Sequence, residues 1–205
     1  MDTRRVRREK GRTRSRRIRA ILAGGLVLGV GATATLAAWN DSEYGAATFT
    51  AGRFDIVGAT DGTTFSSHAT TGTAAALNFQ LPPTAMAPGT TTYALFSVRT
   101  ANPSVAGVLQ LTPGTPGGTG LATYLTYGVR TVAAPSCTAA TYPAGTAVIP
   151  DGSALTTAGA TTQAVAANGA AQVNYCFAVT LPTAAANGAQ GLTMTQTWQI
   201  QGTSS

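Results

Sequence analysis

Few side chains in this sequence could carry out acid–base, nucleophilic or metal chemistry. The 205 residues include a single histidine, His68, within the stretch FSSHATTG. A zinc site normally needs three or four ligands, and the sequence has neither an HExxH pattern nor a G-x-S-x-G pattern. We therefore expect His68 to be a solvated loop residue. We expect no catalytic, cofactor-binding or metal site, and so we do not expect the chain to be an enzyme.

The acidic residues indicate turns rather than a paired-carboxylate site. After the N-terminal region, five acids are dispersed along the chain: Asp41, Glu43, Asp55, Asp61 and Asp151. Asp61 and Asp151 each precede a glycine, a pair typical of turns. Five aromatic residues could form a carbohydrate platform, but strand alternation favours the core for most of them: Tyr124, Tyr127, Tyr142, Tyr175 and Trp198.

The first 38 residues have the organisation of a secretion signal. Ten of the thirteen basic residues lie between Arg4 and Arg19, which form an n-region, and residues 20–38 form an apolar h-region. Small residues end this region, so we expect a signal peptidase to cut between Ala38 and Trp39. The alternative is an uncleaved membrane anchor through residues 20–38. If the signal peptide is cleaved, only the precursor is associated with the membrane.

The charge of the remaining residues argues against a nucleic-acid partner. The full chain carries a net charge of +6. Residues 39–205, however, contain three arginines against five acids, a net charge of −2. Without the N-terminal arginines these residues have no cluster of basic side chains, which nucleic-acid binding needs. We expect residues 39–205 to form one domain with a sizeable core.

Two cysteines, Cys137 and Cys176, lie in this domain. Export places them in an oxidising compartment, where an even cysteine count favours a disulfide; two buried thiols are the alternative. Alternation within residues 171–181 directs Cys176 away from the apolar face, so we expect the bridge at a sheet surface or edge.

Apolar residues recur with a period close to two, which is typical of β-strands. The clearest strands are residues 171–181 and 191–202, each with one apolar and one polar face. We expect further strands at residues 48–57, 77–81, 93–100, 105–112, 121–132 and 146–149, and a surface loop at residues 152–169. Eight or so short strands separated by Gly and Pro turns predict an all-β, antiparallel sandwich or barrel. We expect a signal-peptide helix to precede this domain at the N-terminus.

Residues 36–58, LAAWNDSEYGAATFTAGRFDIVG, resemble the start of the TasA/camelysin family of exported Gram-positive proteins. The matching residues are Ala37-Ala38, Trp39, Asn40-Asp41, Thr48-Phe49, Gly52 and Phe54-Asp55. Weaker similarity follows at Met86–Gly89 and in the closing residues 196–202. The sequence differs from the family in its cysteine pair, its few lysines and its shorter loops.

This resemblance implies processing by a SipW-type signal peptidase, a jelly-roll-like β-sandwich and assembly into biofilm matrix fibres. We therefore expect a secreted structural or surface protein whose main partner is a second copy of itself. A monomeric module that binds cell-wall glycan or a surface protein is one alternative, and an exported hydrolase is another. The candidate assembly segment would add as a strand to a neighbouring subunit, and its aromatic residues are Trp39, Tyr44, Phe49 and Phe54.

Overall fold

The computed structural model describes residues 3–34, 40–80 and 86–205, which divide into the units Met1–Phe49 and Thr50–Ser205. In the first unit, helix α1 spans Thr3–Ala34, as expected for the N-terminal segment. Apolar side chains along it are exposed, among them Ile21, Leu26 and Leu28. Within the described ranges, no helix is long and apolar enough to cross a membrane.

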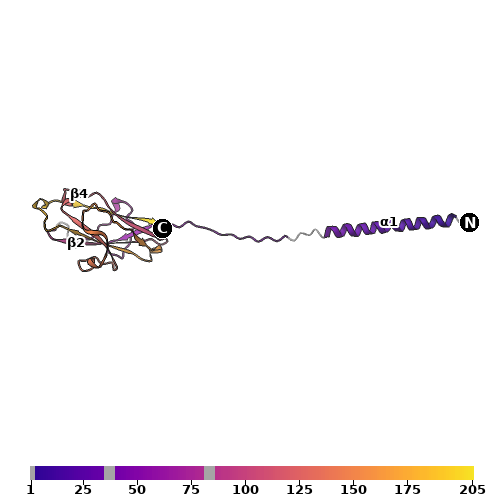
Figure 1. Cartoon of the computed structure of the whole chain (residues 1–205), viewed down its shortest axis with the longest axis horizontal. Helices are drawn as coiled ribbons and strands as arrows, with labels where there is room; N and C mark the ends of the chain where they lie inside the picture. Colours follow the sequence, from indigo (N-terminus) through magenta and orange to yellow (C-terminus); the bar gives the residue numbers. More distant parts are fainter. Residues whose placement is uncertain (1–2, 35–39, 81–85) are drawn as a thin grey trace. The chain divides into compact units, whose positions relative to one another are not determined.

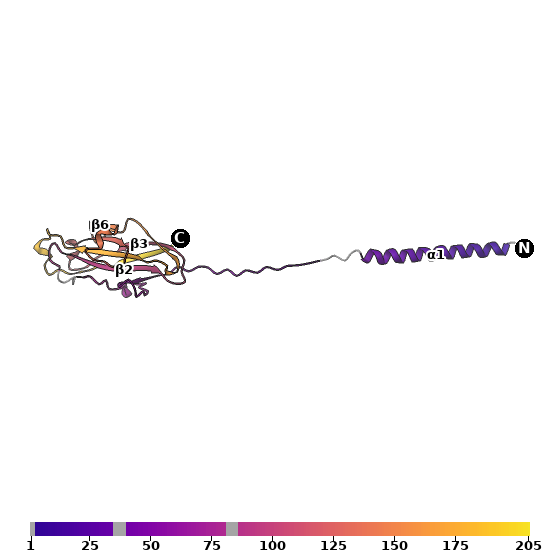
Figure 2. The same cartoon turned by 90° about the horizontal axis from the view of Figure 1, so that it is seen from below.

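The second unit is built from antiparallel sheets, which confirms the all-β prediction for this part of the chain (Figures 1 and 2). The larger sheet has five strands in the order β1-β2-β8-β5-β6. In that order their bounds are Ile56–Ala59, Thr91–Thr100, Val173–Thr180, Thr126–Val132 and Thr146–Ser153.

The smaller sheets have three and two strands. The three-stranded sheet has the order β10-β3-β7, with bounds Trp198–Ser204, Gly107–Pro113 and Gln163–Val165. The two-stranded sheet pairs β4 with β9, Gly117–Gly118 with Met194–Thr195. Short 3-10 turns occur at Thr71–Thr73, Leu121–Thr123, Tyr142–Ala144, Ala167–Gly169 and Asn187–Ala189.

One core unites the five-stranded and three-stranded sheets. Leu109 and Leu111 of β3 are fully buried in the same cluster as Val129 of β5 and Phe177 of β8. Figure 2 labels β2 and β3, one strand from each of these sheets. Burial of these side chains on both inner faces supplies the main driving force for folding of this unit.

Several expected strands are confirmed, with small changes at their ends. Residues 93–100, 105–112 and 171–181 correspond to β2, β3 and β8, and residues 146–149 begin β6. In residues 121–132 a 3-10 turn precedes β5. In residues 191–202, the odd positions from Gly191 are exposed and the even ones partly buried, so the predicted alternation holds, but the stretch divides between β9 and β10 in two sheets.

Three segments differ from the predictions. In residues 48–57 only the last two belong to a strand, β1. Residues 77–80 form no strand, and residue 81 lies outside the described residues. The expected loop 152–169 contains β7 and the end of β6. The alanines and threonines of this segment do not alternate with apolar residues, so the sequence did not predict β7. The strand is held by its pairing with β3.

Candidate functional site

The Sγ atoms of Cys137 and Cys176 lie at disulfide distance, 1.89 Å apart. Cys176 faces away from the main core, as expected, and belongs to a separate cluster. It does not lie at a sheet edge or on an exposed surface, because β8 is the middle strand of five and Cys176 is 0% exposed. Cys137 belongs to the covering segment, residues 133–145, which lies over the outer face of this sheet. Leu95 and Tyr142 pack with the cysteine pair in a second apolar cluster.

Polar contacts also hold the covering segment. Arg130 of β5 pairs with Asp151 of β6, with Nη2 2.8 Å from Oδ2. Nη1 of Arg130 donates to the carbonyl oxygens of Pro143 and Gly145, at 3.3 and 3.2 Å. The hydroxyl of Tyr142 donates to Oδ1 of Asp151. Asp151, expected to be a turn residue, therefore lies within a strand and links β6 to the covering segment.

The pKa values of Tyr142 and Asp151 shift in opposite directions. Burial raises the pKa of Tyr142, and its hydrogen bond to Asp151 raises that pKa further. For Asp151 burial alone would raise the pKa, but the hydrogen bonds from Tyr142 and Arg130 outweigh burial and lower it. Asp151 is therefore held as a carboxylate, which keeps its ion pair with Arg130 intact.

The candidate assembly residues have different surroundings. Trp39 lies outside the described residues, as does the expected cut after Ala38. Residues 40–49 form no strand, and the side chains of Tyr44 and Phe49 are 95% and 93% exposed. Phe54 instead packs within its own unit, against the core that includes Leu109.

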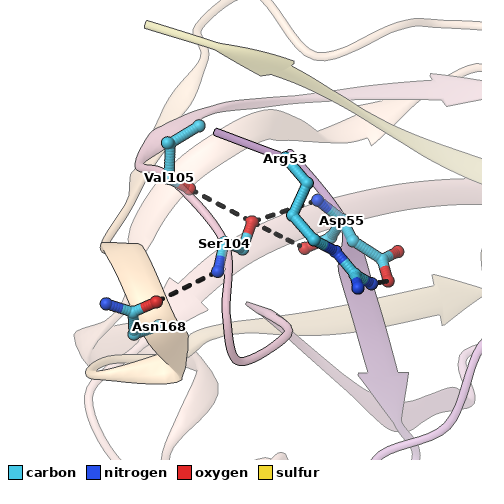
Figure 3. Close-up of polar contacts among 5 residues, drawn as sticks. All are labelled: Arg53, Asp55, Ser104, Val105 and Asn168. Carbon is cyan, nitrogen blue, oxygen red and sulfur yellow. Dashed lines mark hydrogen bonds and ion pairs between the residues drawn. The ribbon is translucent and has the colours of Figure 1, made fainter. Parts of the chain in front are cut away.

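Ser104 fastens the segment that precedes β1 (Figure 3). Its Oγ accepts a hydrogen bond from the amide of Asp55 at 3.0 Å, and lies 3.3 Å from the carbonyl oxygens of Asp55 and Val105. The amide of Ser104 donates to Oδ1 of Asn168 at 3.0 Å. Arg53 pairs with Asp55 at 3.1 Å. This clamp explains why residues 53–55 are fixed although they belong to no strand.

A cleft of about 1290 Å³ lies in the second unit, lined by residues of β1, β2, β8 and β10. Its walls are mainly apolar and include Phe96, Phe177, Trp198 and Ile200. The lining contains two ionisable side chains, Asp55 and His68. Such a cavity is large enough for a small ligand or a peptide segment.

Two buried polar atoms in the cleft wall have no hydrogen-bond partner among the described residues: Nε1 of Trp198 and Oε1 of Gln196. Nε2 of Gln196 is occupied, since it donates to the carbonyl oxygens of Gly114 and Thr197 at 2.9 and 3.0 Å. Two residues that line the cleft thus carry one unsatisfied donor and one unsatisfied acceptor, and leaving each of these atoms buried costs free energy.

His68 lies in a loop, as we expected, but it is not fully solvated. Its side chain is partly buried, and both ring nitrogens have partners. Nε2 lies 3.0 Å from Oγ of Ser66, and Nδ1 lies 3.0 Å from the carbonyl oxygen of Thr73. The sequence search missed this arrangement because it looked for G-x-S-x-G. The spacing Ser-x-His, with both side chains on one face of an extended chain, is the signal that could have found it.

Other candidate chemistry is not assembled by the fold. In the part of the chain that the structure describes, no three His, Cys, Asp or Glu residues lie close enough to hold a metal. Tyr127, Tyr142 and Tyr175 are at most 6% exposed, so they face the interior rather than a surface ligand. Comparison with protein-family models and with curated protein sequences gives no match.

Proposed function

We propose that this chain is an exported structural protein that assembles with copies of itself by strand addition. The proposal includes a jelly-roll-like domain of the TasA/camelysin kind, released outside the cell by cleavage between Ala38 and Trp39. The resemblance of residues 36–58 supports this assignment. Two observations together carry the proposal of self-assembly: Tyr44 and Phe49 are exposed, and the second unit contains an apolar cleft.

Export is supported by the character of the N-terminal unit. The basic run between Arg4 and Arg19 is followed by an apolar segment, and α1 covers the basic run and residues 20–34. The apolar side chains of Leu22, Leu26 and Leu28 are 67–76% exposed, a state that favours insertion into the export machinery or a membrane. A cysteine pair at disulfide distance is compatible with an oxidising destination.

Tyr44 and Phe49 are the large apolar side chains that lack a partner in residues 40–49. Across the described part of Thr50–Ser205, the surface offers little else for association: Val105, at 38%, is the exposed large apolar residue there. A flat hydrophobic interface between domains is therefore poorly supported. Insertion of the aromatic residues of 40–49 into a cavity of another copy would remove them from water.

The cleft suits an extended peptide. A peptide group has a carbonyl that can accept from Nε1 of Trp198 and an amide that can donate to Oε1 of Gln196. Both atoms are buried, so the two side chains must turn toward the inserted strand to form these hydrogen bonds. Strand β10 forms one wall, and among the described strands it pairs with β3 alone. An added strand would also pair with the free edge of β10. Such a contact repeats from copy to copy without closing, which produces a filament.

Deletion of residues 39–47 tests the proposal. The chain beginning at Trp39 should form filaments visible by electron microscopy above a critical concentration, and the chain beginning at Thr48 should not. Both should give the same β-type circular dichroism, because the core cluster begins at Phe54. Tyr44→Ser should weaken assembly more than the neighbouring substitution Ala46→Ser. Equal polymerisation of all four chains, or of none at any concentration, would overturn strand addition.

A further inference from the structure

Ser66, His68 and Thr73 form a relay of two hydrogen bonds. The carbonyl oxygen of Thr73 can only accept, so Nδ1 of His68, 3.0 Å away, must carry the hydrogen. In a neutral ring Nε2 is then an acceptor, and it lies 3.0 Å from the hydroxyl oxygen of Ser66. A hydroxyl next to a base that a third group orients is the signature of an activated nucleophile. We propose that Ser66 and His68 are a nucleophile and its base, and that Ser66 accepts an acyl group from an apolar ester.

The fold places Ser66 through its backbone. The amide and carbonyl of Ser66 exchange two hydrogen bonds of 2.9 Å with Gly58 of β1. A Cβ at residue 58 would lie 2.5 Å from Cζ of Phe96, so glycine is needed for this approach. The ring of Phe96 packs in turn near His68, with centroids 6.4 Å apart. Ser66 and His68 are therefore positioned from β1 and β2 of the main sheet.

The third member of the relay is held by a local turn. Thr71–Thr73 is a 3-10 turn whose preceding residue, Thr70, donates its amide to Oγ1 of Thr73 at 3.3 Å. The hydroxyls of Thr70 and Thr73 lie 3.0 Å apart. These bonds fix the direction of the Thr73 carbonyl. That carbonyl keeps the hydrogen on Nδ1 of His68 and stabilises the imidazolium that forms when Nε2 takes a proton.

The surroundings define the substrate class. Ser66 is exposed, while Ser67 and His68 line the apolar cleft. Because His68 itself and Asp55 are the ionisable residues of that lining, an uncharged ester with an apolar part fits best. Among the described residues, the amide of Ser67 makes no hydrogen bond. The amide that follows a nucleophilic serine commonly stabilises the developing oxyanion, and that of Ser67 is available for this role.

The transfer proceeds in two steps. Oγ of Ser66 bonds to the carbonyl carbon of the ester while its proton moves to Nε2 of His68. The bond from that carbon to the alkoxide then breaks, and the alkoxide takes the proton from Nε2. The products are acyl-Ser66, a free alcohol and neutral His68. A backbone carbonyl stabilises imidazolium less than a carboxylate would, which slows both acylation and hydrolysis of the acyl group. An ester with a good leaving group acylates faster than water releases the acyl group, so we expect a single acylation that water reverses slowly.

A fluorophosphonate that carries an alkyl chain tests the proposal, because a serine nucleophile displaces its fluoride and retains the phosphonyl group. The full chain should gain one phosphonyl group, and peptide mapping should place it on Ser66. His68→Ala should slow labelling by about 10²-fold or more, the usual contribution of a positioned base. Ser66→Ala should abolish it, whereas Ser136→Ala should retain it, because Ser136 is an exposed serine outside both the relay and the cleft lining. p-Nitrophenyl butyrate should release one equivalent of p-nitrophenol in a burst.

Labelling spread over several hydroxyls, or unchanged by His68→Ala in a chain with wild-type circular dichroism, would overturn the proposal. So would the absence of labelling in the wild-type chain. The inference does not rest on self-assembly, because residues 39–49 take no part in the relay. Below the critical concentration for filaments, where no neighbouring copy fills the cleft, the chain that lacks residues 39–47 should therefore label at the rate of the complete chain.

Discussion

The ring of Phe54 lies against Gly202 of β10, where a Cβ would come within 2.6 Å of Cε1 of the ring. Gly107 on β3 also leaves space for this ring, because a Cβ at residue 107 would lie 2.6 Å from Cε2 of Phe54. The two glycines thus form a notch that receives Phe54. A residue that the sequence suggested for intermolecular contact is consequently part of the internal packing.

Gly202→Ala should therefore destabilise the domain by about 1–3 kcal/mol, the usual cost of overpacking. The loss should be smaller in a Phe54→Leu background, because leucine removes the ring atoms that meet the new methyl group. Urea unfolding of the two single variants and the double variant measures this coupling. Gly72→Ala is the control, because its nearest neighbour is 3.9 Å away. Equal losses with and without Phe54 would show that the ring does not set the cost.

The cysteine pair should be oxidised in the purified protein. Intact mass should be lower than that of the reduced chain by two hydrogen atoms, and alkylation of Cys137 and Cys176 should require a reductant. The bridge joins residues 39 positions apart, so its loss should cost about 4 kcal/mol on the chain-entropy estimate. The double variant Cys137→Ala, Cys176→Ala should unfold at correspondingly lower urea. Full alkylation without reductant would contradict the disulfide.

Acid should weaken the link between Asp151 and the covering segment. The pKa of Asp151 is lower in the fold than its ordinary value, so this carboxylate stabilises the fold above that ordinary value. The stabilisation is lost as pH falls through the lowered pKa, from about pH 4 downward. Since the side chain is 55% exposed, we expect Asp151→Asn to remove less than about 1 kcal/mol at pH 7. Urea unfolding at pH 7 and pH 3 measures the difference.

Asp61 supplies a control for this pH dependence. The amides of Thr64 and Thr63 donate to its carboxylate and lower its pKa, so Asp61 loses stabilisation over the same acid range. Asp61→Asn and Asp151→Asn should each remove a separate part of the acid sensitivity, and the two parts should add. An Asp151→Asn chain with the full wild-type difference between pH 7 and pH 3 would show that the Arg130 contact does not depend on this carboxylate.

The expected cut can be checked directly. Protein recovered from the culture medium should begin at Trp39 by N-terminal sequencing, since small residues precede this position. Replacement of Ala38 with a bulky residue such as leucine should slow processing and retain the precursor. Protein found only in membranes, with Arg4 to Arg19 still attached, would instead support an uncleaved anchor.

Alternation in the sequence predicted the directions of side chains but not what covers them. Residues 171–181 do form β8, yet both faces of that strand are buried. Its outward residues Asn174, Cys176 and Ala178 are small or polar, which is typical of an exposed face. They are covered by residues 133–145, a segment without periodicity of its own. Long-range covering of this kind cannot be read from the local pattern.

The candidate sites show the same limit. Residues 48–57 have strand-like composition, but the clamp at Ser104 and the notch for Phe54 replace ladder pairing before β1. The relay of Ser66, His68 and Thr73 depends on a turn and on a bridge to Gly58, neither of which a motif search contains. The cysteine pairing was predictable, because two cysteines allow one intramolecular bridge.

Trp198→Phe separates the stability of one subunit from that of the assembly. Phenylalanine retains aromatic contact with Phe177, whose ring centroid is 5.0 Å from that of Trp198, but it removes the unpartnered Nε1–H. In the unassembled chain that donor makes no hydrogen bond, so its removal offsets part of the lost apolar contact. The melting temperature of the unassembled protein should therefore change little.

In the assembled state the same donor is expected to bond a carbonyl of the inserted strand. Its loss should raise the critical concentration for filament formation by about 5-fold to 10-fold, equivalent to one hydrogen bond of about 1 kcal/mol. Sedimentation of filaments over a concentration series measures this shift, with Tyr124→Phe, which leaves Nε1 of Trp198 in place, as the control. An unchanged critical concentration, with an unchanged melting temperature, would show that the inserted segment does not reach Trp198.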